Sequence, residues 1–121
     1  MTDLKDRKCE ACCVGAPLVT QEEMDELMPQ IPDWHIIEEE GTQRLFRTFK
    51  FPNFREALSF TTKVGEQAEA EGHHPTIVTE WGKVMVTWWS RKIKGLHVSD
   101  FIMAAKTDQL FSQLAAQTTS E

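Results

Sequence analysis

The most regular hydrophobic pattern of the chain lies in residues 53–71. Apolar side chains recur there at close to the period of an α-helix, at Phe54, Ala57, Leu58, Val64 and Ala68. Asn53 is a preferred N-cap residue, and Glu56 is at the third helical position, where a carboxylate suits a helix N-terminus. Gly72 suits the left-handed residue that closes a helix. The pattern predicts a long helix over residues 53–71, and the proline at position 75 prevents it from continuing.

Two further segments carry helical signals. Thr20 and Glu23 have the spacing of a capping box, in which the two residues satisfy each other's backbone N–H groups. They predict a short helix that runs to about Met28 and stops before the next proline. Ser99 or Asp100 is expected to open a last helix. The apolar stripe of that helix consists of Phe101, Ala104, Ala105, Leu110, Phe111 and Leu114.

Four segments have the composition and alternation of β-strands, and they form two predicted hairpins. Residues 34–40 and 43–51 flank one glycine-containing turn, and residues 76–80 and 83–90 flank another. Glycine can take the positive φ that such tight turns require. The last strand alternates between two faces, one with Val84, Val86 and Trp88 and the other with Met85, Thr87, Trp89 and Arg91.

The predicted order is helix, two strands, helix, two strands, helix. This order fits an α+β fold, with a four-stranded antiparallel sheet and helices packed on one face. Residues 1–17 have no periodicity and are expected to form a flexible cysteine-containing arm. Residues 18–116 then make the folded domain, and residues 117–121 are expected to fray.

Composition and charge exclude several classes of protein. The 121 residues are 40% hydrophobic and carry a formal charge of −6, which disfavours nucleic acid as the main partner because phosphate binding needs a basic face. No apolar run approaches the roughly 18 residues of a membrane span. The first eight residues lack the apolar core of a secretory signal. We therefore expect a cytoplasmic protein with no membrane partner.

Three cysteines fall close together at the N-terminus. Cys9 and Cys12 have the spacing of half a zinc site, and Cys13 follows directly. No second pair of ligands with such a spacing follows in the chain, although His35 or another subunit could supply them. A redox motif belongs at the start of a helix in a strand-helix-strand setting, and these cysteines lie in a polar arm. We expect no metal and a dispensable arm.

The candidate chemistry lies where the long helix gives way to a strand, in the stretch Glu69-Ala-Glu-Gly-His-His-Pro75. It places the imidazoles of His73 and His74 side by side. Imidazole is the side chain whose ordinary pKa lies nearest neutrality, so proton transfer is the first chemistry to consider. The alternative is an exposed pair of histidines without a function.

From Glu69 onward the sequence resembles the pterin-4a-carbinolamine dehydratase family, whose mammalian member also serves as the dimerisation cofactor of a hepatocyte transcription factor. An acid precedes the His-His-Pro motif by four residues, and an aromatic residue follows it. The matching residues are Glu69, His73, His74, Pro75, Trp81, the strand from Gly82 to Ser90, Gly95, Leu96 and Asp100. The cysteine arm and the Trp88-Trp89-Ser90 triplet are similar to the bacterial branch associated with phenylalanine hydroxylation.

The resemblance implies a reaction. A member of this family dehydrates 4a-hydroxytetrahydropterin to the quinonoid dihydropterin and so recycles the cofactor of aromatic amino-acid hydroxylases. The reaction places a proton on the departing 4a-hydroxyl and removes another from the ring nitrogen N5, and it needs no cofactor. The resemblance also implies a homodimer or homotetramer, and the predicted hairpin of residues 76–90 offers an edge that a second subunit could cover.

The family pattern also implies the site. His73 and His74 are expected to lie in the pterin pocket, one binding and one carrying protons, without a basis for deciding which does which. Glu69 lies one helical turn before His73 and could orient an imidazole and raise its pKa, or it could be a solvated carboxylate on the helix face. Trp89 and Ser90 complete the expected substrate-binding residues.

Arg91 departs from the family, which usually has a third histidine at this position. Arginine is effectively always protonated, so it cannot exchange protons at neutral pH. We expect Arg91 to hold an oxygen of the pterin by its charge, rather than to be a solvent-facing basic residue. The alternative function is a non-catalytic dimerising or transcription-regulatory module on the same fold.

Overall fold

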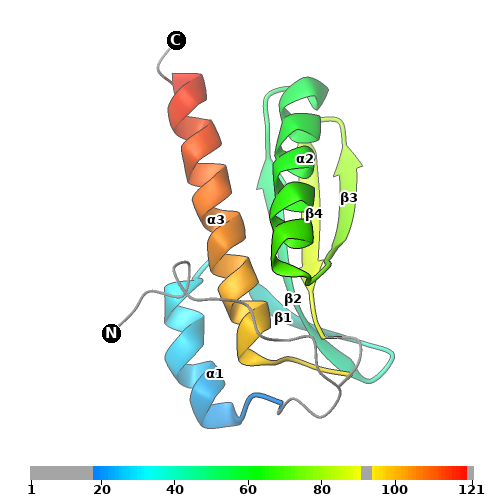
Figure 1. Ribbon diagram of the computed structural model, residues 1–121, viewed down its shortest axis with the longest axis vertical. Helices are drawn as coiled ribbons and strands as arrows, with labels where there is room; N and C mark the ends of the chain where they lie inside the picture. The colour runs from blue at the N-terminus through cyan, green and yellow to red at the C-terminus, as the bar shows by residue number, and fades with distance from the viewer. Residues whose placement is uncertain (1–17, 91–93, 120–121) are drawn as a thin grey trace.

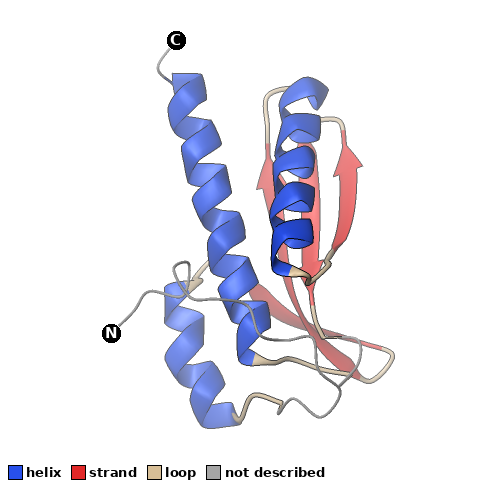
Figure 2. Cartoon of the chain, in the orientation of Figure 1, coloured by secondary structure: helices blue, strands red, loops and turns tan. Residues whose placement is uncertain are grey.

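The computed structural model describes residues 18–90 and 94–119, and it has the predicted order of elements (Figure 1). The helices are α1 (Gln21–Leu27), the short 3-10 helix η2 (Met28–Gln30), α2 (Phe54–Glu71) and α3 (Val98–Thr119). The strands are β1 (His35–Glu39), β2 (Thr42–Lys50), β3 (Thr76–Glu80) and β4 (Lys83–Trp88). They form one antiparallel sheet in the order β1-β2-β4-β3, and α2 and α3 lie side by side on one of its faces (Figure 2). The predicted α+β fold is confirmed.

The predicted helix caps are present. The Thr20 hydroxyl accepts a hydrogen bond from the Glu23 N–H, and the Glu23 carboxylate accepts one from the Thr20 N–H. The Asn53 side chain accepts a bond from the Glu56 N–H at 2.9 Å. Gly72 follows α2 with a φ of 68°, the left-handed conformation that favours glycine. These local signals fix where α1 begins and where α2 begins and ends.

Several element boundaries differ from the prediction. The chain does not stop being helical before Pro29, because the 3-10 helix η2 continues to Gln30. The ends of β1 and β2 each differ by one residue. Strand β4 ends at Trp88 instead of Ser90, because Ser90 pairs with Gly95 in an isolated bridge. Helix α3 begins at Val98, before the predicted Ser99 or Asp100. It also continues to Thr119, so it includes three residues of the stretch that we expected to fray.

The core lies between the sheet and the helices. Alternate residues of β2 and β4 are fully buried against α2 and α3, namely Leu45, Phe49, Val84, Val86 and Trp88. Aromatic rings join the layers, and the centroids of Phe49 and Phe60 are 4.7 Å apart. Such alternation is what a sheet covered on one face requires. Along the described residues, no helix combines the length and the apolar composition that a membrane crossing needs.

An ion pair ties the sheet to α3. The guanidinium of Arg47 on β2 lies 2.6 Å from the Asp108 carboxylate, which also accepts a 2.8 Å hydrogen bond from the Trp34 indole. Burial raises the pKa of Asp108, and the bonds from Trp34 and Arg47 oppose that rise. The contact fixes the middle of α3 against the sheet.

Replacing Asp108 by alanine is expected to lower the free energy of unfolding by about 1–3 kcal/mol, because the substitution leaves the buried donors of Trp34 and Arg47 without this acceptor. Urea titration of the two proteins measures the difference. Glu80→Ala is the matched control, since the ion pair of Glu80 with Lys83 is exposed. Equal stabilities of the two variants would contradict the structural role of Asp108.

Candidate functional site

The two histidines leave the chain in different directions at the end of α2. Gly72 turns the backbone, and the His73 N–H bonds back to the Ala68 carbonyl at 3.2 Å. Pro75 favours an extended backbone at His74, and β3 begins at the next residue, Thr76. The His73 side chain is turned into the protein and is 8% exposed, whereas that of His74 is 57% exposed. One imidazole is therefore held in the interior and the other is open to solvent.

His73 is bound to a buried carboxylate. Its Nε2 lies 2.6 Å from Oδ1 of Asp100, a residue with no exposed surface, in the first turn of α3. The imidazole also stacks on Trp88 of β4, with centroids 5.4 Å apart and an angle of 25° between the rings. Because the carboxylate accepts a hydrogen bond from Nε2–H, Nδ1 is left as the acceptor of the His73 ring. The arrangement sets both the tautomer and the orientation of the imidazole.

Asp100 joins three segments of the chain. Its second oxygen, Oδ2, accepts a hydrogen bond from the Ser90 hydroxyl at 2.8 Å and one from the His97 N–H at 2.9 Å. Together with His73 on Oδ1, three donors therefore satisfy a fully buried carboxylate. A buried charge that is paired and hydrogen-bonded in this way is costly to disturb. Asp100 thereby fixes the end of α2, the end of β4 and the start of α3 relative to one another.

His74 has its own carboxylate. Its Nε2 lies 3.0 Å from Oε2 of Glu69, and the Glu69 side chain is 74% exposed. The pair lies at the surface, where its Coulomb attraction is weak. The predicted proximity of Glu69 to one of the histidines is present, and the partner is His74. The site thus contains two imidazole–carboxylate pairs on adjacent residues, one buried and one exposed, which is an arrangement suited to proton transfer.

Ser90 and Trp89 separate onto opposite faces of the sheet. Ser90 is buried and belongs to the Asp100 cluster. Trp89 lies on the face without helices, where the Arg44 guanidinium sits 4.1 Å from its ring centroid and also pairs with Glu39. The structure therefore brings Ser90 to the carboxylate that binds His73, and it places Trp89 on the other face of the sheet. Arg91 lies outside the described residues, as do Cys9, Cys12 and Cys13.

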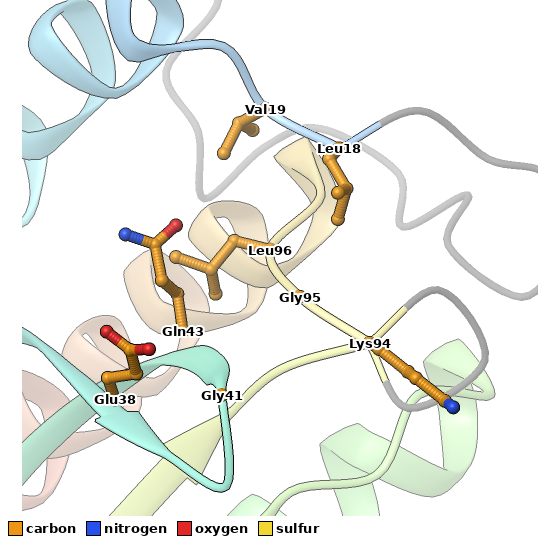
Figure 3. Close-up of a pocket in the computed structure, with 8 residues that line it drawn as sticks. All are labelled: Leu18, Val19, Glu38, Gly41, Gln43, Lys94, Gly95 and Leu96. Atoms are coloured by element: carbon orange, nitrogen blue, oxygen red, sulfur yellow. The ribbon is translucent and has the colours of Figure 1, made fainter.

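A hollow of about 310 Å³ lies beside the segment that precedes α3 (Figure 3). Glu38 and Gln43 line it from the β1–β2 hairpin, and the segment from Lys94 to Leu96 lines it from the loop before α3. Leu18 closes one side, and a Cβ on Gly95 would lie only 2.6 Å from its Cδ2 atom. The Val19 N–H also bonds to the Leu96 carbonyl at 2.8 Å. The segment before α1 therefore packs against the loop that leads into the Asp100 cluster.

Sequence reasoning missed the role of Asp100. It placed this residue at the opening of the last helix and among the residues shared with the family, but not in the site. The sequence did contain a signal for this role. Asp100 is a carboxylate in the first turn of a helix and Ser90 is a hydroxyl at a strand end, and both kinds of group bind imidazoles or backbone donors. Only the fold brings the His73 side chain, 27 residues earlier, to that carboxylate.

The chain is similar to known proteins over most of its length. Residues 17–110 match the sequence model of the family described as "Pterin 4 alpha carbinolamine dehydratase". A relative from Nitrosococcus oceani named "Putative pterin-4-alpha-carbinolamine dehydratase" is 64% identical over 110 residues, which are 91% of this chain and 97% of that protein. A relative of the same name from Syntrophotalea carbinolica is 60% identical over 110 residues, 91% of this chain and 98% of its own length.

A solved structure agrees with these relatives. The crystal structure of a "transcriptional coactivator/pterin dehydratase" from Brucella melitensis has a TM-score of 0.70 and 28% identity, and the alignment covers 78% of this chain and 98% of that one. The family match, the bacterial relatives and the fold lead to one conclusion. This chain belongs to the pterin-4a-carbinolamine dehydratase family.

Proposed function

We propose that the protein dehydrates 4a-hydroxytetrahydropterin to the quinonoid dihydropterin. The observation that carries this proposal is the buried His73–Asp100 pair, next to a second imidazole–carboxylate pair on the following residue. The reaction consumes one proton at the departing hydroxyl and releases one from N5. Two imidazoles of different exposure supply a separate group for each proton.

His73 is the group that takes the proton from N5. Its Nε2–H is committed to Asp100, so Nδ1 is the nitrogen that can accept a proton. The imidazolium that then forms faces a buried carboxylate held by Ser90 and the His97 backbone, which stabilises the positive charge. Trp88 excludes water from one face of the ring. Asp100 and Ser90 act through His73 and are positioning residues.

His74 is the group that gives a proton to the 4a-hydroxyl, which leaves as water. Its exposure lets it regain a proton from solvent after each turnover, and Glu69 holds the ring at Nε2. The proton that His73 gains from N5 returns to solvent, so the number of protons on the protein is unchanged over the cycle. Arg91 remains the predicted partner of a pterin oxygen.

The direct test is a dehydration assay with the purified wild-type protein, followed by ultraviolet absorbance. We expect the protein to accelerate formation of the quinonoid dihydropterin and to suppress accumulation of the 7-isomer of the pterin. Heat-denatured protein is the control for the uncatalysed reaction. An unchanged rate with native protein would overturn the proposal and favour the non-catalytic dimerising or regulatory module.

The biological setting follows from the same proposal. A protein with this activity recycles the pterin cofactor of an aromatic amino-acid hydroxylase, and it acts as a homodimer or homotetramer. The supporting observation for the assembly is the outer edge of β3, which pairs only with β4 among the described residues 18–90 and 94–119. Sedimentation showing only a 13.9 kDa monomer at micromolar concentration would contradict the assembly.

A further inference from the structure

A third histidine is bound to the same carboxylate as His73, through its backbone N–H. His97 immediately precedes α3, and its N–H donates to Oδ2 of Asp100 at 2.9 Å while His73 binds Oδ1. Its side chain turns to the helix that follows, where Nδ1 lies 3.1 Å from the Ser99 N–H and 2.9 Å from the Ser99 hydroxyl. His97 is therefore the N-cap of α3, and Asp100 satisfies its backbone in return.

The contacts of His97 determine which ring nitrogen carries the proton. Nδ1 accepts the hydrogen bond of the Ser99 N–H, so the proton of the neutral ring is on Nε2. Among residues 18–90 and 94–119, no group accepts a hydrogen bond from this Nε2–H. The ring is half-buried, so the donor can still be reached from outside. A ligand at this end of α3 can therefore accept a hydrogen bond from it.

Helix capping alone does not require an imidazole at this position. Serine, threonine, aspartate and asparagine are the side chains that cap helices best, and each is smaller than histidine. Any of them could accept the Ser99 N–H. What histidine adds is a second nitrogen, whose hydrogen-bond donor is directed away from the cap.

We propose that His97 is a substrate-binding residue of this site, in which its Nε2–H holds the departing 4a-oxygen of the pterin. The inference rests on the proposed dehydratase function. His97 supplies an imidazole to a chain that has Arg91 at the position where the family usually has a third histidine. His97 donates a hydrogen bond and keeps its proton, so His74 remains the acid and the proton balance of the reaction is unchanged.

The experiment separates capping from substrate binding by replacing His97 with serine. The serine hydroxyl can cap the Ser99 N–H, but it has no group that corresponds to Nε2–H. We expect the thermal midpoint of His97→Ser to stay near that of the wild type, because the cap is retained. We expect kcat to fall about 10²-fold with little change in KM, as for the loss of a donor to an oxygen that develops charge in the transition state.

The outcomes distinguish this inference from the function on which it rests. An inactive wild-type protein overturns the proposed function. An active wild type with a fully active His97→Ser variant overturns only the role of His97, and leaves it as a cap. If His97→Ser does not fold, His97→Asn provides the same comparison with another strong N-cap residue.

A double variant gives an independent test. Adding Arg91→His to His97→Ser returns an imidazole at the position of the usual family histidine. If His97 has taken over the role of that residue, the double variant regains activity relative to His97→Ser. Equal activities of the single and double variants would overturn the inferred exchange of roles between the two positions.

Discussion

Replacing His73 by glutamine is expected to lower kcat for pterin dehydration by about 10²–10⁴-fold, the usual contribution of a well-placed acid or base. The glutamine amide can still donate a hydrogen bond to Asp100, so the buried carboxylate keeps a partner. An amide cannot exchange protons at neutral pH. The measurement is the rate of dehydration at saturating substrate, together with the thermal midpoint of each protein.

His35→Gln is the matched control for this substitution. His35 is exposed on β1, at the opposite edge of the sheet from β3, which follows the histidine pair. The control variant should retain the activity and the stability of the wild type. Near wild-type turnover by His73→Gln would show that the buried imidazole carries no proton in the reaction, and the assignment of the base would be wrong.

Asp100→Asn is expected to have an effect of similar size on kcat, about 10²–10⁴-fold. The asparagine has nearly the same shape, but it lacks the charge that stabilises an imidazolium on His73. Its NH2 group also faces one of the groups that donate a hydrogen bond to the Asp100 carboxylate. The reason is electrostatic as well as geometric, since the carboxylate is fully buried. The assay is the same, and circular dichroism reports on the fold.

Loss of stability is a competing explanation for an inactive Asp100→Asn variant, and Asp108→Asn tests it. Asp108 is also an acidic residue of α3 that binds side chains of other segments, but its partners are Arg47 and Trp34. We expect Asp108→Asn to lose stability and to keep its turnover below its melting range. If both variants lost activity in proportion to their stability, Asp100 would be structural only.

Most of the fold could be predicted because its signals are local. The Thr20–Glu23 capping box, the Asn53 cap and Gly72 each act within a few residues, and each is present in the structure. The glycine turns fix the two hairpins in the same way. The order of the elements then leaves few arrangements other than an antiparallel sheet covered by helices.

The site was harder to predict because it depends on pairing between distant segments. Alternation separates Trp88 from Trp89, but it does not say which of them faces the helices. The register of β2 against β4 decides this, since Leu45 pairs with Trp88 and both are buried. The expectation that Trp89 binds substrate came from the family resemblance and made no use of this register. Glu69 is close enough to the histidines in the sequence to be predicted as their partner, whereas Asp100 is 27 residues from His73 and is not.

The Ser90–Gly95 bridge has a consequence for how this protein can change in evolution. Two backbone hydrogen bonds join Ser90 directly to Gly95. Ser90 is fixed independently by Asp100, and Leu96 by Val19. Because these contacts hold both sides of the His73–Asp100 pair, we expect the pair to keep its place when residues 91–93 are substituted. We therefore expect Arg91→His to fold as the wild type does, so that the chemistry at position 91 can evolve without repacking of the core.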